Sequence, residues 1–475
     1  MNEFRSDGRL RPQASESHVE QIAAVEVGLR PAYGVKGAVT QTWTLEDRMR
    51  HYKVPGVSIA VAIDGELAWA RAYGVGMSDD IQAVNTDTLF QAASLSKPIA
   101  SLAALKLVEE GKISLDAPVN DYLVSWKIPD NKFTDATPVT LRHLMSHRAG
   151  TTIHGFKGYK DGAPIPTLPQ ILDGEAPSNT SPVRVMAEPG STYRYSGGGY
   201  TIIQLLIEDV THDKYANVVG EKILAPANMK RSNFDYPPKD NNFATGHVGK
   251  NSEPITAPGI AYPELAAAGV WTTPTELVRL GSRVAQSRNA GNTFLRNDLA
   301  VQLVPPSVEG PGLGFGLNNP GDGLAFVHNG HNPGYSARWI NYADGRASVA
   351  ILTNADSGGD LIREILSAVG HIYGWKQDGF TERAVVDLSS QEMMLIAGDY
   401  VFNPEDKDPI AKVTIIDNSL WISGPIAEMT RFYPASRNSF FISKGLNFTL
   451  ERDVNDNPIA MSVEGEIRLT KKMPN

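Results

Sequence analysis

The tetrapeptide Ser94-Leu95-Ser96-Lys97 opens an apolar stretch that continues to Leu107. This pattern predicts a helix on which Ser94 and Lys97 share one face, one turn apart. A desolvated lysine can help to activate a serine hydroxyl as a nucleophile. The N-terminus of a helix also supplies backbone N–H groups that favour a developing oxyanion. The tetrapeptide therefore predicts a nucleophilic Ser94 at the start of an apolar helix.

Two hairpin signals stand on either side of the helical part of the chain. In both, an Asp-Gly pair separates two β-rich runs, which favours a tight turn between strands. The runs and their turns are residues 57–63 and 67–73 around Asp64-Gly65, and residues 339–342 and 348–352 around Asp344-Gly345. This order predicts one antiparallel sheet built from both ends of the chain, with helices between and the Ser94 helix at a cleft.

The segments between the hairpins alternate apolar and polar residues with helical spacing. Residues 150–192 are rich in Gly, Pro, Asp and Ser, which predicts a long irregular excursion. Helices are predicted at residues 19–27, 44–53, 94–110 and 200–210, from Thr140 and Thr273 onward, and at residues 361–373.

The last part of the chain has a different pattern. After about residue 385, short apolar runs alternate with turn residues such as Asp417-Asn418. Regular short strands of this kind favour a small antiparallel barrel or sandwich. The sequence thus predicts an N-terminal arm (residues 1–40), a main domain (residues 41–386) and a C-terminal β domain (residues 387–475).

A glycine-rich segment can bring a tyrosine to the Ser94 helix. Residues 193–200 read YRYSGGGY, and a glycine-rich turn can present Tyr195 to a cleft. A phenol normally titrates near pH ~10, and a cation about 4 Å away attracts a phenolate by roughly 4 kcal/mol at an effective dielectric of about 20. We therefore expect Lys97 to lower the pKa of Tyr195 and to make the phenol a proton acceptor.

A second segment belongs beside Ser94. Residues 326–334 read FVHNGHNPG, which predicts a strand edge that opens into a tight turn. His328 would add either a positive charge or a hydrogen bond opposite the Ser94 helix. A glycine at position 330 would let a substrate backbone approach the strand.

Three ordered motifs now resemble a known superfamily. Ser94-x-x-Lys97, Tyr195-Ser196-Gly197 and His328-x-Gly330 are similar to the motifs of the class C β-lactamase-like serine hydrolases. That superfamily, of the peptidase family S12 type, includes penicillin-binding proteins, D,D-peptidases, D-aminopeptidases, family VIII carboxylesterases and class C β-lactamases. The resemblance spans roughly residues 40–375. It implies an α+β, β-lactamase/transpeptidase-like fold, with an antiparallel sheet flanked by helices and a helical subdomain. The C-terminal β domain resembles the lipocalin-like barrel of many members.

The resemblance also implies a mechanism. Ser94 would attack a carbonyl and form an acyl-enzyme, while Tyr195 and Lys97 share the proton traffic; which of them is the formal base stays open. The other implied site residues are His328 as a catalytic residue, the backbone N–H groups of Ser94 and His331 as the oxyanion hole, and Gly197, Gly330 and Asn332 as substrate-binding residues.

Two positions depart from the commonest pattern of the superfamily. Gly197 stands where an asparagine usually contacts the acyl amide of a β-lactam or peptide. His328 stands where lactamases prefer a lysine, and a histidine is largely neutral above a pKa of about 6.5. Both departures favour ester or small amide substrates, or D-amino-acid peptides, over β-lactams.

The sequence therefore predicts a serine hydrolase that forms an acyl-enzyme on a small ester, a D-amino-acid peptide or amide, or a β-lactam-like substrate. The alternatives are a penicillin-recognising sensor with little turnover and an acyltransferase that uses the same residues. The Gly-x-Ser-x-Gly elbow of α/β-hydrolases is absent from the sequence.

Composition narrows the partners to a small-molecule or peptide substrate. A net charge of −9 argues against nucleic acid as a partner. With no cysteine, disulfides and thiolate metal sites are excluded. No cofactor or metal is expected, because Leu144 stands where the His143/His147 pair would need the glutamate of a metalloprotease. Without a secretory signal or an apolar span, the chain is expected in the cytoplasm, or in the periplasm or outside the cell if a leader was removed. A homo-oligomer is left open.

Overall fold

The computed structural model describes residues 18–77, 82–256, 259–291, 294–310 and 312–472. Most of the chain from Glu46 to Ile362 forms one compact unit, and Ala24–Leu45 joins the chain from Arg363 onward in a second unit. The first 17 residues of the predicted N-terminal arm lie outside the described residues. The domain limits after residues 40 and 386 stay predictions.

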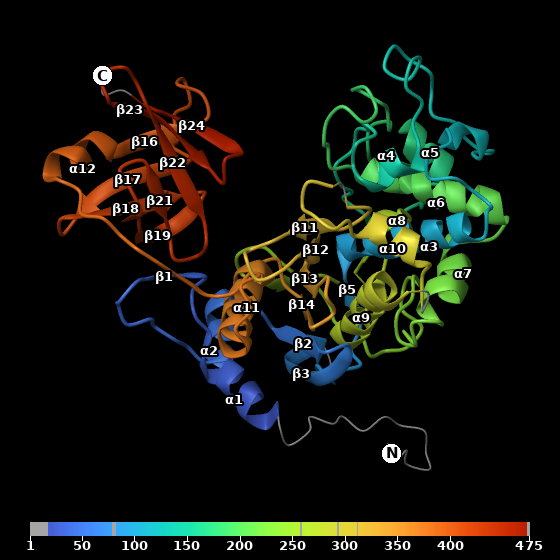
Figure 1. The fold of residues 1–475 in the computed structure, drawn as a ribbon, viewed down its shortest axis with the longest axis horizontal. Helices are drawn as coiled ribbons and strands as arrows, with labels where there is room; N and C mark the ends of the chain where they lie inside the picture. Colours follow the sequence, from blue (N-terminus) through green and yellow to red (C-terminus); the bar gives the residue numbers. More distant parts are fainter. Residues whose placement is uncertain (1–17, 78–81, 257–258, 292–293, 311, 473–475) are drawn as a thin grey trace. The chain divides into compact units, whose positions relative to one another are not determined.

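The first unit contains the predicted antiparallel sheet, which the structure confirms (Figure 1). Its seven strands run in the order β11-β12-β13-β14-β2-β3-β4, and every neighbouring pair is antiparallel. The strands are β2 Gly56–Ile63, β3 Glu66–Met77, β4 Gln82–Ala83, β11 Gly316–Asn318, β12 Ala325–Asn332, β13 Tyr335–Tyr342 and β14 Ala347–Thr353. Because β2 pairs with β14, the early and late hairpins of the chain meet at the middle of one sheet.

The early hairpin turns where the Asp-Gly pair predicts. Asp64 and Gly65 both have positive φ, +49° and +83°, which a two-residue hairpin turn of type I′ requires. Such a turn matches the right-handed twist of the strands, so the local sequence fixes the register of β2 against β3.

Most helices of the first unit lie between the two hairpins in the sequence, and α2 Leu45–Tyr52 precedes the first hairpin. The helices wholly or mostly in the first unit are α2 Leu45–Tyr52, α3 Ser96–Glu109, α4 Leu141–Met145, α5 Leu168–Asp173, α6 Gly197–Thr211, α7 Tyr215–Val219, α8 Leu265–Ala268, α9 Pro274–Ala290 and α10 Asn297–Leu303, with the turns η2 Ala93–Leu95, η3 Val119–Asp121 and η4 Gly220–Leu224. Helix α9 packs on β2 and β14, and α3 packs between α6 and α8. Short two-stranded pairs join loops of the unit: β5 Phe90–Gln91 with β10 Trp271–Thr272, β6 Tyr159–Lys160 with β9 Ile260–Ala261, and β7 His247–Val248 with β8 Glu253–Pro254.

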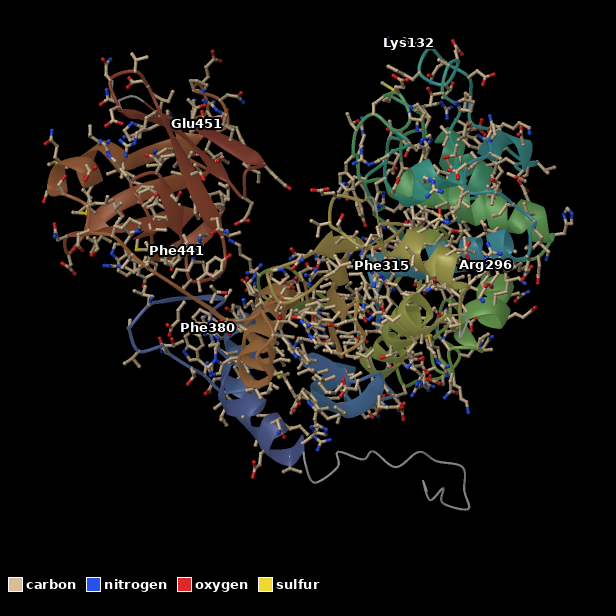
Figure 2. All side chains as sticks on the ribbon, viewed as in Figure 1. Lys132, Arg296, Phe315, Phe380, Phe441 and Glu451 are labelled. Carbon is tan, nitrogen blue, oxygen red and sulfur yellow. The ribbon has the colours of Figure 1, made fainter. Side chains whose placement is uncertain are left out.

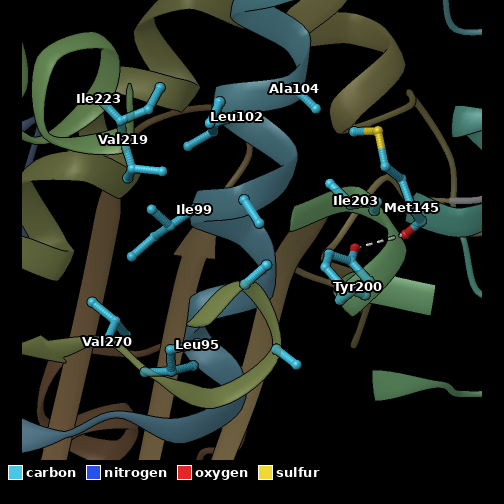
Figure 3. Close-up of a cluster of buried hydrophobic side chains, with 14 of the residues drawn as sticks. Leu95, Ile99, Leu102, Ala104, Met145, Tyr200, Ile203, Val219, Ile223 and Val270 are labelled. Atoms are coloured by element: carbon cyan, nitrogen blue, oxygen red, sulfur yellow. Dashed lines mark hydrogen bonds between the residues drawn. The ribbon is translucent and has the colours of Figure 1, made fainter. Parts of the chain in front are cut away.

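Helix α3 is the centre of the main core. Its apolar side chains surround it on all sides, as a helix buried in a protein interior requires (Figure 3). Leu95, Ile99 and Leu102 are fully buried, and Val219 and Ile223 lie in the same cluster. Elsewhere in the unit, Phe315, which is labelled in Figure 2, packs edge-on against Phe326 of β12 and Trp339 of β13. The turn η2, which carries Ser94, leads directly into α3, and its residues Ala93 and Leu95 are buried.

Two sequence-based expectations need correction. The excursion at residues 150–192 contains α5, which begins with a capping box between Thr167 and Gln170. Helix α6 begins at Gly197 rather than after Gly199, because Ser196 caps it by accepting a hydrogen bond from the N–H of Gly199. The three glycines therefore form the first turn of a helix, not a free loop.

The second unit contains the predicted barrel. Nine antiparallel strands run in the order β19-β18-β17-β16-β24-β23-β22-β21-β20. They are β16 Gly398–Val401, β17 Ala411–Ile416, β18 Ser419–Gly424, β19 Ala427–Arg431, β20 Tyr433–Pro434, β21 Ser439–Phe441, β22 Asn447–Arg452, β23 Pro458–Val463 and β24 Ile467–Lys471. Only Phe432 separates the two edge strands β19 and β20 in sequence, so the sheet curls until it nearly closes. Its interior is an apolar cluster that includes Phe440 and Phe448.

The remaining elements complete the chain. They are α1 Val19–Val27, β1 Tyr33–Val35 paired in parallel with β15 Thr381–Arg383, α11 Gly358–Tyr373 and α12 Ser390–Ile396. Within the described parts of residues 18–472, no helix combines the length and the apolar character needed to cross a bilayer.

Candidate active site

The turn that carries Ser94 is held in a strained shape. Ala93 has φ +52°, a left-handed conformation that costs a non-glycine residue of the order of 1 kcal/mol or more. The Ser96 hydroxyl stabilises this shape, because it donates to the carbonyl of Ala93 (2.7 Å) and accepts from the N–H of Val270 (3.0 Å). Long-range contacts therefore fix the backbone on which the predicted nucleophile stands.

Lys97 contacts Ser94 as the tetrapeptide predicts. Its Nζ lies 2.9 Å from the Ser94 Oγ and 2.8 Å from the carbonyl oxygen of Ala267 on α8. The side chain is only 2% exposed, and burial lowers the pKa of the Lys97 amine to about 7. Near pH 7 the Lys97 amine is therefore neutral in a large fraction of the molecules, and in that form it can accept the proton of Ser94.

Tyr195 completes the cluster, but its pKa moves in the opposite direction to the expected one. The Lys97 Nζ lies 5.0 Å from the centre of the Tyr195 ring, and the phenol interacts with the Ser94 hydroxyl. Burial raises the pKa of the phenol to about 12, and the hydrogen bond with Ser94 offsets only part of that rise. The expectation of a lowered pKa was wrong because it assumed a charged amine, whereas burial favours the neutral form of both groups.

His328 lies on β12 and is neutral. Its Nδ1 is 2.6 Å from the carbonyl oxygen of Asn329, and because a carbonyl only accepts, Nδ1 carries the proton. Burial, with the Lys97 amine as a smaller cause, lowers the pKa of His328 to about 3. Of the two roles predicted for this ring, the positive charge is excluded; a hydrogen bond remains, with Nε2 as an acceptor.

The backbone of β12 meets the Ser94 turn. A two-residue loop joins Asn332 to Tyr335, so these two residues exchange hydrogen bonds and the next pair, His331 with Ser336, does not. The N–H of His331 therefore points away from β13, on the edge of β12 that β11 leaves unpaired. A Cβ on Gly330 would lie 2.2 Å from the carbonyl oxygen of Ala92, so the glycine permits this close approach.

Two of the predicted substrate-binding residues pack against other parts of the protein. The Asn332 side chain is 3% exposed, and its amide nitrogen donates to Gln91 (2.9 Å) and to the carbonyl of Ala268 (3.2 Å). It links β12 to α8, which does not support the predicted contact with substrate. A Cβ on Gly197 would lie 2.9 Å from the ring of Phe156, so this position has no free space for the asparagine expected from the superfamily pattern.

A cavity of about 250 Å³ adjoins the catalytic cluster. Tyr195 and His328 form part of its wall, and Phe315 and Arg148 lie among the other lining residues. Concave pockets of this kind are where proteins bind small ligands. No group of three or more metal-ligating side chains is found in the described part of the chain.

One residue of the site was missed by the sequence analysis. His147 was considered only for its spacing from His143, yet its ring packs against Tyr195 with centroids 4.3 Å apart. The Nδ1 of His143 instead accepts from the N–H of Thr140 at the start of α4. No local pattern indicates the role of His147, because its partners are more than 45 residues away in sequence.

Comparisons with known proteins agree with this geometry. A family model described as Beta-lactamase matches residues 43–369, which is more than half of the chain. Penicillin-binding protein 4* of Bacillus subtilis is 24% identical over 83% of this chain and 90% of its own length. Esterase EstB of Burkholderia gladioli is 25% identical (57% and 76%), and a D-aminopeptidase of Brucella anthropi is 26% identical (67% and 60%).

A solved structure shares the fold over most of both chains. It is described as the octameric penicillin-binding protein homologue from Pyrococcus abyssi. The TM-score is 0.58 at 20% identity, over 90% of this chain and 98% of that one.

Proposed function

Because this chain belongs to the beta-lactamase family, we propose that it is a serine hydrolase that forms an acyl-enzyme on Ser94 and cleaves a small ester or amide. The observation that carries the proposal is the 2.9 Å contact between the Ser94 hydroxyl and a buried amine whose pKa is about 7. A nucleophile and a base within hydrogen-bond reach, with the base held by a third group, is the arrangement that covalent catalysis needs. Here the third group is the carbonyl of Ala267.

The first half-reaction follows from these contacts. The neutral Lys97 amine takes the proton of Ser94 as its Oγ bonds to the carbonyl carbon of the substrate. The negative charge that forms on the carbonyl oxygen is stabilised by the backbone N–H groups of Ser94 and His331. Tyr195 stays protonated because its pKa is about 12. Its phenol can therefore give a proton to the leaving oxygen or nitrogen and take one back from the Lys97 ammonium.

In the second half-reaction, water attacks the acyl-enzyme. The amine, neutral again, accepts a proton from the water, and Ser94 leaves with a proton returned through the same groups. Hydrolysis thus proceeds in two steps through a covalent bond to Ser94. All protons are transferred among Ser94, Lys97, Tyr195, water and the substrate.

The substrate class follows from what the site lacks. The crowding of Gly197 by Phe156 leaves no side-chain amide to hold the acyl amide of a β-lactam. His328 is neutral and cannot replace a lysine that binds a carboxylate by charge. These features favour short esters and small amides, including D-amino-acid amides, over β-lactams. The names of the esterase and D-aminopeptidase relatives support the same choice.

The test combines labelling with turnover. The wild type and Ser94→Ala are incubated with a fluorophosphonate and with p-nitrophenyl butyrate, and then with a panel of D-amino-acid amides and nitrocefin. We expect labelling and ester turnover only in the wild type, and little hydrolysis of nitrocefin. Equal labelling and turnover by both proteins would overturn the proposal. A persistent penicillin adduct without turnover, seen by mass spectrometry, would favour a sensor instead.

A further inference from the structure

His147 lies at an unusual place in the chain. It follows helix α4 by two residues, is 7% exposed and has φ +56°. Left-handed backbone is uncommon outside glycine, and histidine is one of the few residue types that adopt it more often. Its conformation is therefore held by long-range contacts, and those contacts lead to the site of the proposed reaction.

Two hydrogen bonds tie His147 to both neighbours of Tyr195. The carbonyl oxygen of His147 accepts from the N–H of Arg194 (2.7 Å), and its Nδ1 accepts from the N–H of Ser196 (3.1 Å). Between these bonds, the imidazole packs on the face of the phenol ring at an interplanar angle of 32°. One residue therefore fixes the backbone on each side of Tyr195 and one face of its ring.

The hydrogen bond from Ser196 also fixes the tautomer of His147. Because Nδ1 accepts from an N–H, it carries no proton, so the neutral ring carries its proton on Nε2. Burial keeps the pKa of His147 well below its ordinary value, and smaller contributions come from the nearby Lys97, His328 and His154. The Nε2–H is buried and has no hydrogen-bond partner among the described residues. His147 also lines the 250 Å³ cavity beside Tyr195.

We propose that His147 is the positioning residue for Tyr195: its carbonyl oxygen and Nδ1 hold the backbone on both sides of the phenol, and its ring holds one face of the phenol beside Ser94. The proposal rests on the hydrolase function described above. This hold places the phenol where it can give and take a proton, so its loss should slow the steps that need this proton.

Two substitutions separate the two ring nitrogens. The Oδ1 of asparagine in His147→Asn can occupy the place of Nδ1, and asparagine tolerates the left-handed backbone. The longer side chain in His147→Gln can bring an N–H to the place of Nε2 but cannot hold Ser196. The first variant keeps the hold on the Tyr195 backbone, and the second loses it.

The measurement uses two esters that differ in the need for a proton on the leaving group. Phenyl butyrate leaves as a basic phenolate that needs the proton of Tyr195, whereas p-nitrophenyl butyrate does not. For His147→Gln we expect turnover of phenyl butyrate to fall about 100-fold, because a small misplacement of Tyr195 is enough for a loss of this size. Turnover of the nitrophenyl ester should fall much less. For His147→Asn we expect kcat for both esters to stay within about tenfold of the wild type, because the hydrogen bond from Ser196 is kept.

His143→Asn is the matched control. It makes the same chemical change four residues earlier, where Nδ1 also accepts a backbone N–H but the ring does not reach Tyr195. We expect kcat and KM to stay unchanged, and thermal unfolding of all variants checks that they fold.

The outcomes that contradict the proposal are the following. Equal loss of kcat in both His147 variants, or no loss in His147→Gln, overturns the positioning role. If the wild type itself shows no turnover that depends on Ser94, the proposed function fails and this inference fails with it.

Discussion

The amine of Lys97 lies 2.9 Å from the hydroxyl of Ser94 inside a core that leaves the lysine only 2% exposed. The burial that packs helix α3 into the protein also removes the charge from the amine. A residue that would be a permanent cation on a surface becomes a base near neutral pH. The packing of the core therefore sets the charge of the amine in the site, and this has measurable consequences.

The pH dependence of activity should report Lys97. In the proposed reaction the neutral amine is the base, so kcat/KM for p-nitrophenyl butyrate should rise with pH through about 7 and then stay level to at least pH 10. Tyr195 remains protonated over this range because its pKa is about 12. A pH–rate profile checks this, with Lys97→Arg expected to be inactive because arginine keeps its proton. A main rise above pH 9 would assign the base to the phenol.

Removal of the lysine should stabilise the fold while it destroys activity. The pKa of Lys97 falls from its ordinary value of 10.5 to about 7 on folding, so the folded state binds fewer protons between these pH values. The cost of burying the amine is therefore fully present below pH 7 and disappears as pH rises through about 10.5. Lys97→Met should melt at a higher temperature than the wild type at pH 6, with a smaller gain at pH 9.5.

Thermal unfolding at the two pH values measures this effect. The loss of the bond to Ala267 costs about 1–3 kcal/mol, which is less than the several kcal/mol expected for a shift of this size. Lys112→Met, at a lysine with a half-exposed side chain, is the control and should show no such pH-dependent gain. A lower melting temperature of Lys97→Met at both pH values would contradict the argument.

Gly330→Ala should separate β12 from the turn that carries Ser94. Its Cβ would lie 2.2 Å from the carbonyl oxygen of Ala92, and a backbone atom in a packed core cannot give way cheaply. We expect the variant to lose about 1–3 kcal/mol of stability and to turn over esters about 100-fold more slowly, because His331 moves away from Ser94. Chemical denaturation and ester kinetics measure the two effects. Gly220→Ala, with no atom from outside its own helical segment within 4 Å of the added Cβ, should fold and react like the wild type.

Gly197→Asn should not create a β-lactamase. The Cβ alone would lie 2.9 Å from the Phe156 ring and 3.2 Å from the carbonyl oxygen of His154. We expect the single variant to lose ester activity by about tenfold or more and to gain no nitrocefin hydrolysis, because the loop over α6 must shift. The double variant Gly197→Asn/Phe156→Ala makes room and should recover ester activity. Rapid nitrocefin turnover by the single variant would show that space at residue 197 does not limit the substrate.

Much of the fold follows from local patterns. The Asp64-Gly65 turn, the apolar helix after Ser94 and the short strands of the second unit each depend on neighbours within a few residues. Such signals act through backbone conformation and side-chain period, so they survive in the folded chain. Helix α5 was missed because its capping box lies in a segment whose glycines and prolines favour a loop.

The site was predicted in its parts but not in its electrostatics. The three motifs name Ser94, Lys97, Tyr195 and His328, and the structure brings these four residues together. The expectation that Lys97 lowers the pKa of Tyr195 was wrong, and of the two roles left open for His328 only the hydrogen bond remains, because charge depends on burial and burial is set by residues far away in sequence. For the same reason the sequence could not show that Asn332 is already bonded inside the protein.

The sequence by itself determined which hydroxyl, amine and phenol form the candidate site, and the period and turns of the elements that hold them. These properties are local, since spacing and turn residues act within one or two turns of a helix or one hairpin. Only the tertiary structure decided that the amine is neutral, that the phenol keeps its proton and that His147 holds Tyr195 from more than 45 residues away. Desolvation and long-range contacts exist only after the chain has folded, so no pattern along the sequence contains them.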